Sequence, residues 1–114
     1  MPKYDLEDRT LRFAKACIDL CKALAKDTVN REIVSQLVRS SGSVGANYRE
    51  ANDTSTKKDF YHKIGGICRR EAKESKYWLE LAMHANSQKT KEIESLIDEA
   101  LQLTRIFASI VSKQ

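Results

Sequence analysis

Apolar residues recur along the chain with the 3.6-residue period of an amphipathic helix, in blocks separated by short polar breaks. The blocks predict helices over residues 6–25, 31–51, 56–84 and 90–112. No block shows the alternation of apolar and polar residues that is typical of a strand. Short connections between four such helices favour one domain over residues 1–114, with an all-α fold: an antiparallel up-down-up-down four-helix bundle.

Polar residues at the block boundaries indicate where the helices begin. Asp5 precedes the first block and is its candidate N-cap. Asn30 holds the same place before the second block, and Thr54 or Ser55 before the third. The side chain of each can accept a hydrogen bond from a backbone N–H of the first turn, which has no partner within the helix.

The stretch RSSGSVGANYREA, residues 39–51, is rich in Ser and Gly and could be either a phosphate-binding loop or a helix. A phosphate loop of the form GxxxxGK[ST] needs a Lys and a preceding strand, and the dinucleotide loop needs GxGxxG; the stretch has neither. On a helical wheel, Ser41, Val44 and Tyr48 extend the apolar stripe of the preceding turns. We therefore predict a helix whose small residues let a neighbouring helix approach closely.

Glu71 falls near the middle of the apolar arc predicted for residues 56–84. A buried carboxylate without a partner is costly, so a basic residue on a facing helix is expected, and Arg39 is the candidate. Asn47 and Glu50, on the polar side of the same stretch, could complete a structural polar network. The alternative is a catalytic carboxylate pair, Glu50 with Glu71, but no nucleophile or His accompanies it.

Three cysteines and two histidines are the candidate metal ligands of the chain. Zinc would require Cys17, Cys21 and Cys68 with His62 or His84, and these residues lack the paired spacing of a zinc motif. We expect three reduced, buried thiols and predict no metal, no cofactor, no small-molecule substrate and no catalytic residue.

Composition limits the class of protein further. Of 114 residues, 41% are hydrophobic and 32% charged, as in an ordinary globular domain. No apolar run approaches the ~18 residues of a membrane span, and the first residues, MPKYDLEDRT, lack the apolar core of a signal peptide. We expect a cytoplasmic protein that does not enter a membrane.

Taken together, RSSGSVGANYREA and the following KIGGICRREAKESKYWLELA resemble the bacterial four-helix-bundle proteins encoded in intervening sequences of 23S rRNA genes. The motifs are equally similar to the accessory variability determinants of diversity-generating retroelements. The resemblance covers about residues 10–112 in order and spacing. It implies a homopentameric, barrel-like ring with a basic surface, which partners a reverse transcriptase and binds nucleic acid in the retroelement branch and associates with RNA in the other.

Extra apolar stripes on two predicted helices indicate self-association independently of that resemblance. Leu11, Ile18 and Ala25 recur every seven residues, roughly 120° from the core stripe of their helix. Leu101, Ile106 and Ile110 widen the apolar arc of the last helix. One bundle core cannot easily bury both sides of these helices, although single exposed apolar residues are normal. We predict a homo-oligomer with these residues at its interface.

Positive charge is concentrated in residues 57–76, where seven Lys or Arg and three Asp or Glu leave an excess of four, equal to the net charge of the whole chain. The candidate nucleic-acid-binding residues are Lys58, His62, Lys63, Arg69, Arg70, Lys73 and Lys76. No RNA-reading motif accompanies them, so contacts are expected to be with phosphates. The sequence predicts a non-enzymatic, homo-oligomeric RNA-binding bundle; the alternative is an oligomeric protein-interaction scaffold, such as an accessory subunit of a reverse transcriptase.

Overall fold

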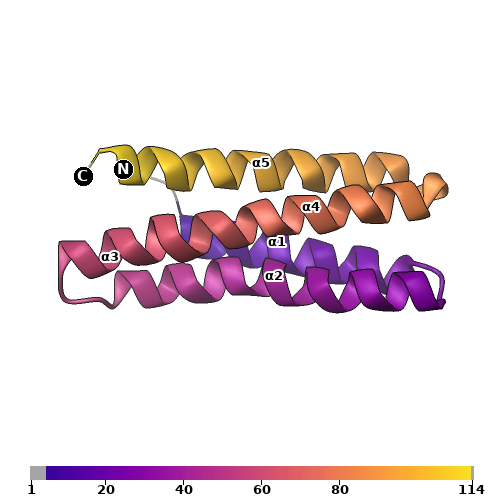
Figure 1. The fold of residues 1–114 in the computed structure, drawn as a ribbon, viewed down its shortest axis with the longest axis horizontal. Helices are drawn as coiled ribbons and strands as arrows, with labels where there is room; N and C mark the ends of the chain where they lie inside the picture. The colour runs from indigo at the N-terminus through magenta and orange to yellow at the C-terminus, as the bar shows by residue number, and fades with distance from the viewer. Residues whose placement is uncertain (1–4, 114) are drawn as a thin grey trace.

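The computed structural model describes residues 5–113 as four antiparallel helical rods (Figure 1). The third rod is continuous but changes its hydrogen-bonding pattern midway. Its parts and the other helices are α1 (Leu6–Ala23), α2 (Thr28–Asn52), α3 (Lys57–Lys63), the π-helix η1 (Ile64–Cys68), α4 (Arg69–Ala85), the short 3₁₀ turn η2 (Ser87–Lys89) and α5 (Thr90–Ser112). The predicted four-helix bundle is therefore confirmed, and no described helix is long and apolar enough to cross a membrane.

Side-chain caps fix where three of the rods begin. Asp5 accepts a hydrogen bond from the Asp8 N–H at 3.1 Å, as predicted. The predicted cap Asn30 is wrong, because Asp27 caps α2 and starts the helix three residues earlier than expected. Thr56, rather than Thr54 or Ser55, caps α3.

Asn30 instead forms a buried amide pair with Asn86 at one end of the bundle. Each side chain donates its Nδ2–H to the Oδ1 of the other at 2.9 Å. The remaining donors reach the carbonyls of Ala25 and Ala82. Burial of two amides is tolerated because their hydrogen bonds are made, and the pair joins the start of α2 to the end of α4.

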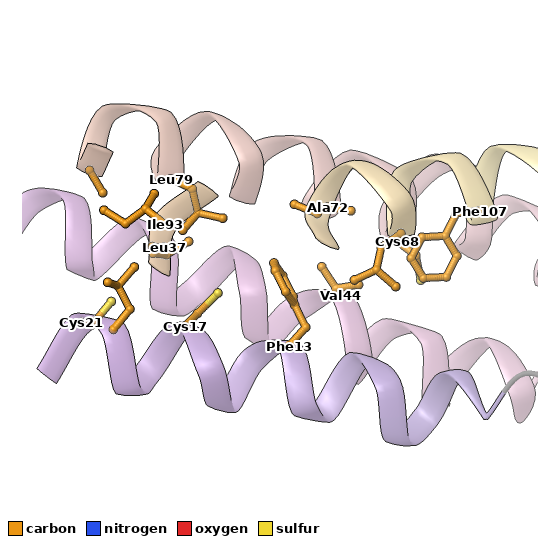
Figure 2. Packing of buried hydrophobic residues seen from close by; sticks show 14 of the residues in the cluster. Phe13, Cys17, Cys21, Leu37, Val44, Cys68, Ala72, Leu79, Ile93 and Phe107 are labelled. Atoms are coloured by element: carbon orange, nitrogen blue, oxygen red, sulfur yellow. The ribbon is translucent and has the colours of Figure 1, made fainter. Parts of the chain in front are cut away.

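All four rods contribute to one core, with α2 between α1 and α4, and α4 between α2 and α5. Figure 2 shows side chains from each rod pointing into this interior, among them Phe13, Leu37, Leu79 and Phe107. Of the four contacts between neighbouring rods, the contact of α1 with α5 is the least extensive.

The small-residue stretch lies wholly inside α2, as predicted, and two of its members make close contacts between helices. A Cβ on Gly45 would lie 2.8 Å from Oγ1 of Thr10, which is fully buried in α1. On the opposite side, the Ser75 hydroxyl of α4 donates to the Ser40 hydroxyl at 2.9 Å. The small residues therefore let α1 and α4 both approach α2.

The π-helix η1 explains the main error in the predicted third helix. Its wider turns add a residue relative to an α-helix, so the side chains of α4 lie on different faces from those of an uninterrupted wheel. The buried positions of α4 are Ala72, Ser75, Leu79 and Ala82. Glu71 therefore lies at the edge of the core and not at its centre.

Gly45→Ala and Gly42→Ala form a matched pair that tests the close approach of α1. Gly42 is exposed with nothing within 4 Å of an added Cβ, so alanine there should stabilise the fold by about 1 kcal/mol through helix propensity. At Gly45 the same change should destabilise the fold by about 1–3 kcal/mol, because buried Thr10 has to move. Urea unfolding followed by circular dichroism measures both; equal stabilisation by the two variants would contradict the contact.

Candidate nucleic-acid interface

The seven predicted basic residues follow the outer side of the third rod, and we call them the basic face: Lys58, His62, Lys63, Arg69, Arg70, Lys73 and Lys76. Four of them, Lys58, His62, Arg70 and Lys73, are exposed to solvent. The other three are half-buried at its borders. Arg70 and Lys73 thus lie at the centre of the face along α4, whereas an uninterrupted wheel predicts Arg69, Lys73 and Lys76 at the centre and Arg70 at the border.

Two border lysines are already neutralised by carboxylates. Lys63 Nζ lies 2.8 Å from Oε1 of Glu50, and Lys76 Nζ lies 3.2 Å from Oε2 of Glu80. Within residues 5–113, no carboxylate pairs with any of the four exposed members of the face. The centre of the basic face therefore forms no salt bridges among these residues, and the nearby charge of Arg70 contributes to the lowered pKa of Glu74.

Two arginines of the basic face also donate hydrogen bonds to backbone carbonyls of the π-helix. Arg69 Nε donates to the carbonyl of Gly65, and Arg70 Nη1 donates to the carbonyl of Gly66, both at 3.2 Å. A π-turn disturbs the regular ladder of backbone bonds, and the guanidinium groups supply donors to carbonyls there. Arg70 remains exposed while bonded in this way, so its other N–H groups face solvent.

Arg39 bridges two carboxylates of α4. Its Nη1 lies 3.5 Å from Oε2 of Glu71, and its Nη2 donates to Oε2 of Glu74. The Arg39 side chain is 50% exposed and that of Glu71 is 21% exposed, so the pair lies at the surface and not in the core. The shorter contact is with Glu74, a partner that the sequence did not single out.

The predicted extension of this network by Asn47 and Glu50 is wrong. Asn47 donates to the carbonyl of Ser43 in its own helix, and Glu50 pairs with Lys63. Glu71 keeps one carboxylate oxygen, Oε1, buried without a hydrogen-bond partner within the described chain. The two carboxylates considered as a catalytic pair thus take part in separate interactions.

Hydrogen bonding alters the acidity of Glu74. The indole Nε1–H of Trp78 donates to its Oε2 at 3.0 Å, and this bond, with a smaller contribution from Arg39, lowers the pKa of Glu74 against the opposing effect of partial burial. The hydrogen bond between Arg39 and Glu74 raises the pKa of Arg39. Glu74 is therefore the central acceptor of the network.

All three thiols are free and buried, as expected. Burial raises the pKa of Cys17 and of Cys68 to about 12 in each case, so neither is a reactive thiolate at neutral pH. In the described part of the chain, no cluster of three or more His, Cys, Asp or Glu side chains is arranged to hold a metal ion.

A second surface feature is an apolar groove of about 660 Å³ between α1 and α2, walled largely by Ile18, Leu24, Val34 and Val38. Ile18 and Val38 are about 40% exposed, an unusual exposure for aliphatic side chains that face each other across two helices. Val38 was missed in the sequence because it lies beside, and not on, the core stripe of α2.

The predicted interface residues divide into two groups. Leu11 and Ile18 are exposed on α1, and Ala25 is exposed just beyond the end of this helix at Ala23; Ile18 and Ala25 both line the groove. Leu101, Ile106 and Ile110 are only half-exposed, and the last two pack against the core. The α1 stripe is thus available for contact with another molecule, whereas Ile106 and Ile110 mainly complete the bundle.

The fold and its surface define a four-helix bundle with one strongly basic face. The chain matches the family model described as 23S rRNA-intervening sequence protein over residues 3–109, and it belongs to that family. The family resemblance carried by residues 39–51 and 63–82 is thereby confirmed; kinship with the retroelement determinants stays a prediction.

A crystal structure supports the same placement. A protein of unknown function from the S23 ribosomal protein family of Bacteroides thetaiotaomicron superposes with a TM-score of 0.81 at 32% sequence identity, covering 92% of this chain and 96% of that one. None of the curated proteins matches this chain.

Glu74→Gln tests the network through its pH dependence. Because the folded pKa of Glu74 is lowered, its ionised form stabilises the fold above the unfolded pKa of about 4.3, and that contribution is lost as pH falls through the folded value. The Glu74 side chain is 38% exposed, so the free energy of unfolding of the wild type at pH 7 should exceed that of Glu74→Gln by less than about 1 kcal/mol.

Urea unfolding of both proteins from pH 7 down to pH 3 measures the difference, which should shrink to zero under acid conditions. Glu94→Gln, on an exposed carboxyl without an ion pair in residues 5–113, is the control and should show no such trend. A stability difference that stays constant with pH would show that ionised Glu74 contributes nothing.

Proposed function

We propose that this chain is a non-enzymatic, homo-oligomeric bundle that acts in the cytoplasm and binds RNA through the basic face. The observation that carries the proposal is the exposed charge of Lys58, Arg70 and Lys73, which form no salt bridge with a carboxylate within the described residues. Phosphates of a nucleic acid can supply their counter-charge. Membership of a family described by 23S rRNA intervening sequences supports RNA as the nucleic acid.

The mode of binding follows from the shape of the face. It is the outer side of a helical rod that carries cations, so its contacts are made with phosphates and depend strongly on salt. The cysteines and the Glu71 and Glu50 carboxylates are buried or engaged elsewhere, which supports a binding role over a catalytic one.

Self-association supports the same function. The exposed aliphatic side chains of the α1–α2 groove gain by burial against another copy, and each added copy repeats the basic face. Several weak phosphate contacts on one RNA then add through effective concentration. A pentamer is what the family resemblance implies, and the groove itself favours assembly without setting the number of copies.

The triple variant Lys58→Ala, Arg70→Ala and Lys73→Ala tests the basic face. It should reduce retention of RNA at low salt, and the slope of log K against log salt should flatten by about 0.7 for each lost contact with a single strand. The matched control is Lys15→Ala, Lys91→Ala and Arg105→Ala, which removes the same charges from exposed sites on α1 and α5.

Loss of RNA binding confined to the first variant supports the proposal. Equal losses in both variants would indicate attraction by net charge alone, and undiminished binding by the first would remove RNA as the ligand of this face. If wild type binds an acidic protein but no RNA, the scaffold alternative takes its place.

Ile18→Glu tests the assembly. A charge on the wall of the apolar groove should split the oligomer, and light scattering should then give a mass near the 13.0 kDa of one chain. Val29→Glu is the control, since Val29 is 60% exposed in the first turn of α2 but does not line the groove. A wild-type mass of one chain would refute self-association.

A further inference from the structure

Tyr77 lies beside the basic face, and it is the one exposed Tyr, Phe or Trp side chain among the described residues. It is 55% exposed in α4. Tyr77 lies four residues after Lys73 and seven after Arg70, a spacing that places all three on one side of the helix within about 10 Å. The ring of Tyr77 thus lies on the same side of α4 as Arg70 and Lys73, the two central cations of the basic face.

Contacts with Trp78 hold the ring of Tyr77 in place. It meets the indole of Trp78 edge to face, with centroids 5.3 Å apart and planes at 74°. Trp78 in turn donates to Glu74, which Arg39 holds from α2. A platform ordered in advance loses little conformational entropy when a ligand stacks on it.

A second ring lies further along the same face. His62 is exposed, and a Cβ on Gly66 would lie 3.6 Å from its Cε1 and Nδ1 atoms. Because position 66 is glycine, the imidazole lies close to the helix there without meeting a side chain of that residue. Aromatic rings therefore lie on both sides of Arg70 along the rod.

Rings interleaved with cations are what proteins use to hold unpaired bases and their backbone. In a duplex the bases are stacked on one another and their faces are inaccessible, so a ring such as Tyr77 gains nothing there. Building on the function proposed above, we infer that the basic face binds single-stranded nucleic acid, with an unpaired base stacked on Tyr77 and adjoining phosphates held by Arg70 and Lys73.

The test compares affinities for labelled oligouridine of about 12 nucleotides, for oligothymidine of the same length and for duplex RNA of that length. Wild type should bind both single strands more tightly than the duplex. Tyr77→Leu, which keeps apolar bulk against Trp78 but removes the ring, should weaken single-strand binding about five- to hundredfold and leave duplex binding unchanged. Tyr77→Phe should bind single strands as wild type does.

Two further measurements separate stacking from other roles of Tyr77. Leu81→Ala removes an exposed apolar side chain four residues later on the same side of α4 and should bind like wild type. Trp78 is the single tryptophan of the chain, so stacking on the ring beside it should change its fluorescence when single strands are added.

Three outcomes would overturn the inference: wild type preferring the duplex, Tyr77→Leu binding single strands normally while the triple Lys/Arg variant does not, or Tyr77→Leu changing the mass of the oligomer in place of the affinity. The second outcome leaves the RNA-binding proposal intact and excludes only the stacking of a base on Tyr77. Failure of wild type to bind any of the three oligonucleotides would remove both.

Discussion

The π-helix at Ile64–Cys68 determines which side chains of the third rod face the core and which face solvent. Beyond it, Ala72, Ser75 and Leu79 turn inward, and Arg70, Lys73 and Tyr77 turn outward. An uninterrupted α-helix would rotate these residues away from their present sides. The glycine at position 65 permits the segment to lie close to α5, because a Cβ there would come within 2.9 Å of Val111. The π-helix therefore determines both which residues of the third rod are buried and which of its charged side chains are exposed.

The contact between Arg39 and Glu74 links the interior of the bundle to this outer surface. Arg39 belongs to the small-residue stretch of α2, whose close packing fixes its distance from α4. Through Glu74 it orients Trp78, and Trp78 supports Tyr77. Because the salt bridges are half-exposed, their effect on stability is small. They also hold Glu74 beside Trp78, whose indole donates to Glu74 and lies edge to face against Tyr77.

Much of the fold could be predicted because periodic apolar residues are sufficient to define four helices and their antiparallel order. The start of α2 was missed because Asp27 and Asn30 are equally good caps in a sequence, and only the tertiary contact with Asn86 assigns Asn30 to the interior. The π-helix was missed because Gly65 and Gly66 give no signal of their own within a helical pattern. That single omission moved Glu71 into the predicted core.

The candidate site was predictable in composition but not in geometry. Clustering of Lys and Arg in residues 57–76 predicted a basic face on the third rod, whereas the pairing of Lys63 with Glu50 depends on the turn between α2 and α3. Tyr77 was not predicted as a site residue because the site was predicted from charged side chains alone. Its exposure follows from the rotated face of α4, which no periodicity in the sequence reports.

The charges that hold this bundle together are separate from those that face solvent along α4. At the loosely packed seam between α1 and α5, Arg9 grips Glu99 with two nitrogen–oxygen contacts of 2.8 Å, and both side chains are about three-quarters buried. Such a bidentate, partly desolvated pair contributes to the fold. Lys58 and Lys73 make no comparable contact in the described chain, so their removal leaves the packing intact. The positive charge of Lys58 and Lys73 is therefore separate from the contacts that hold the described helices together.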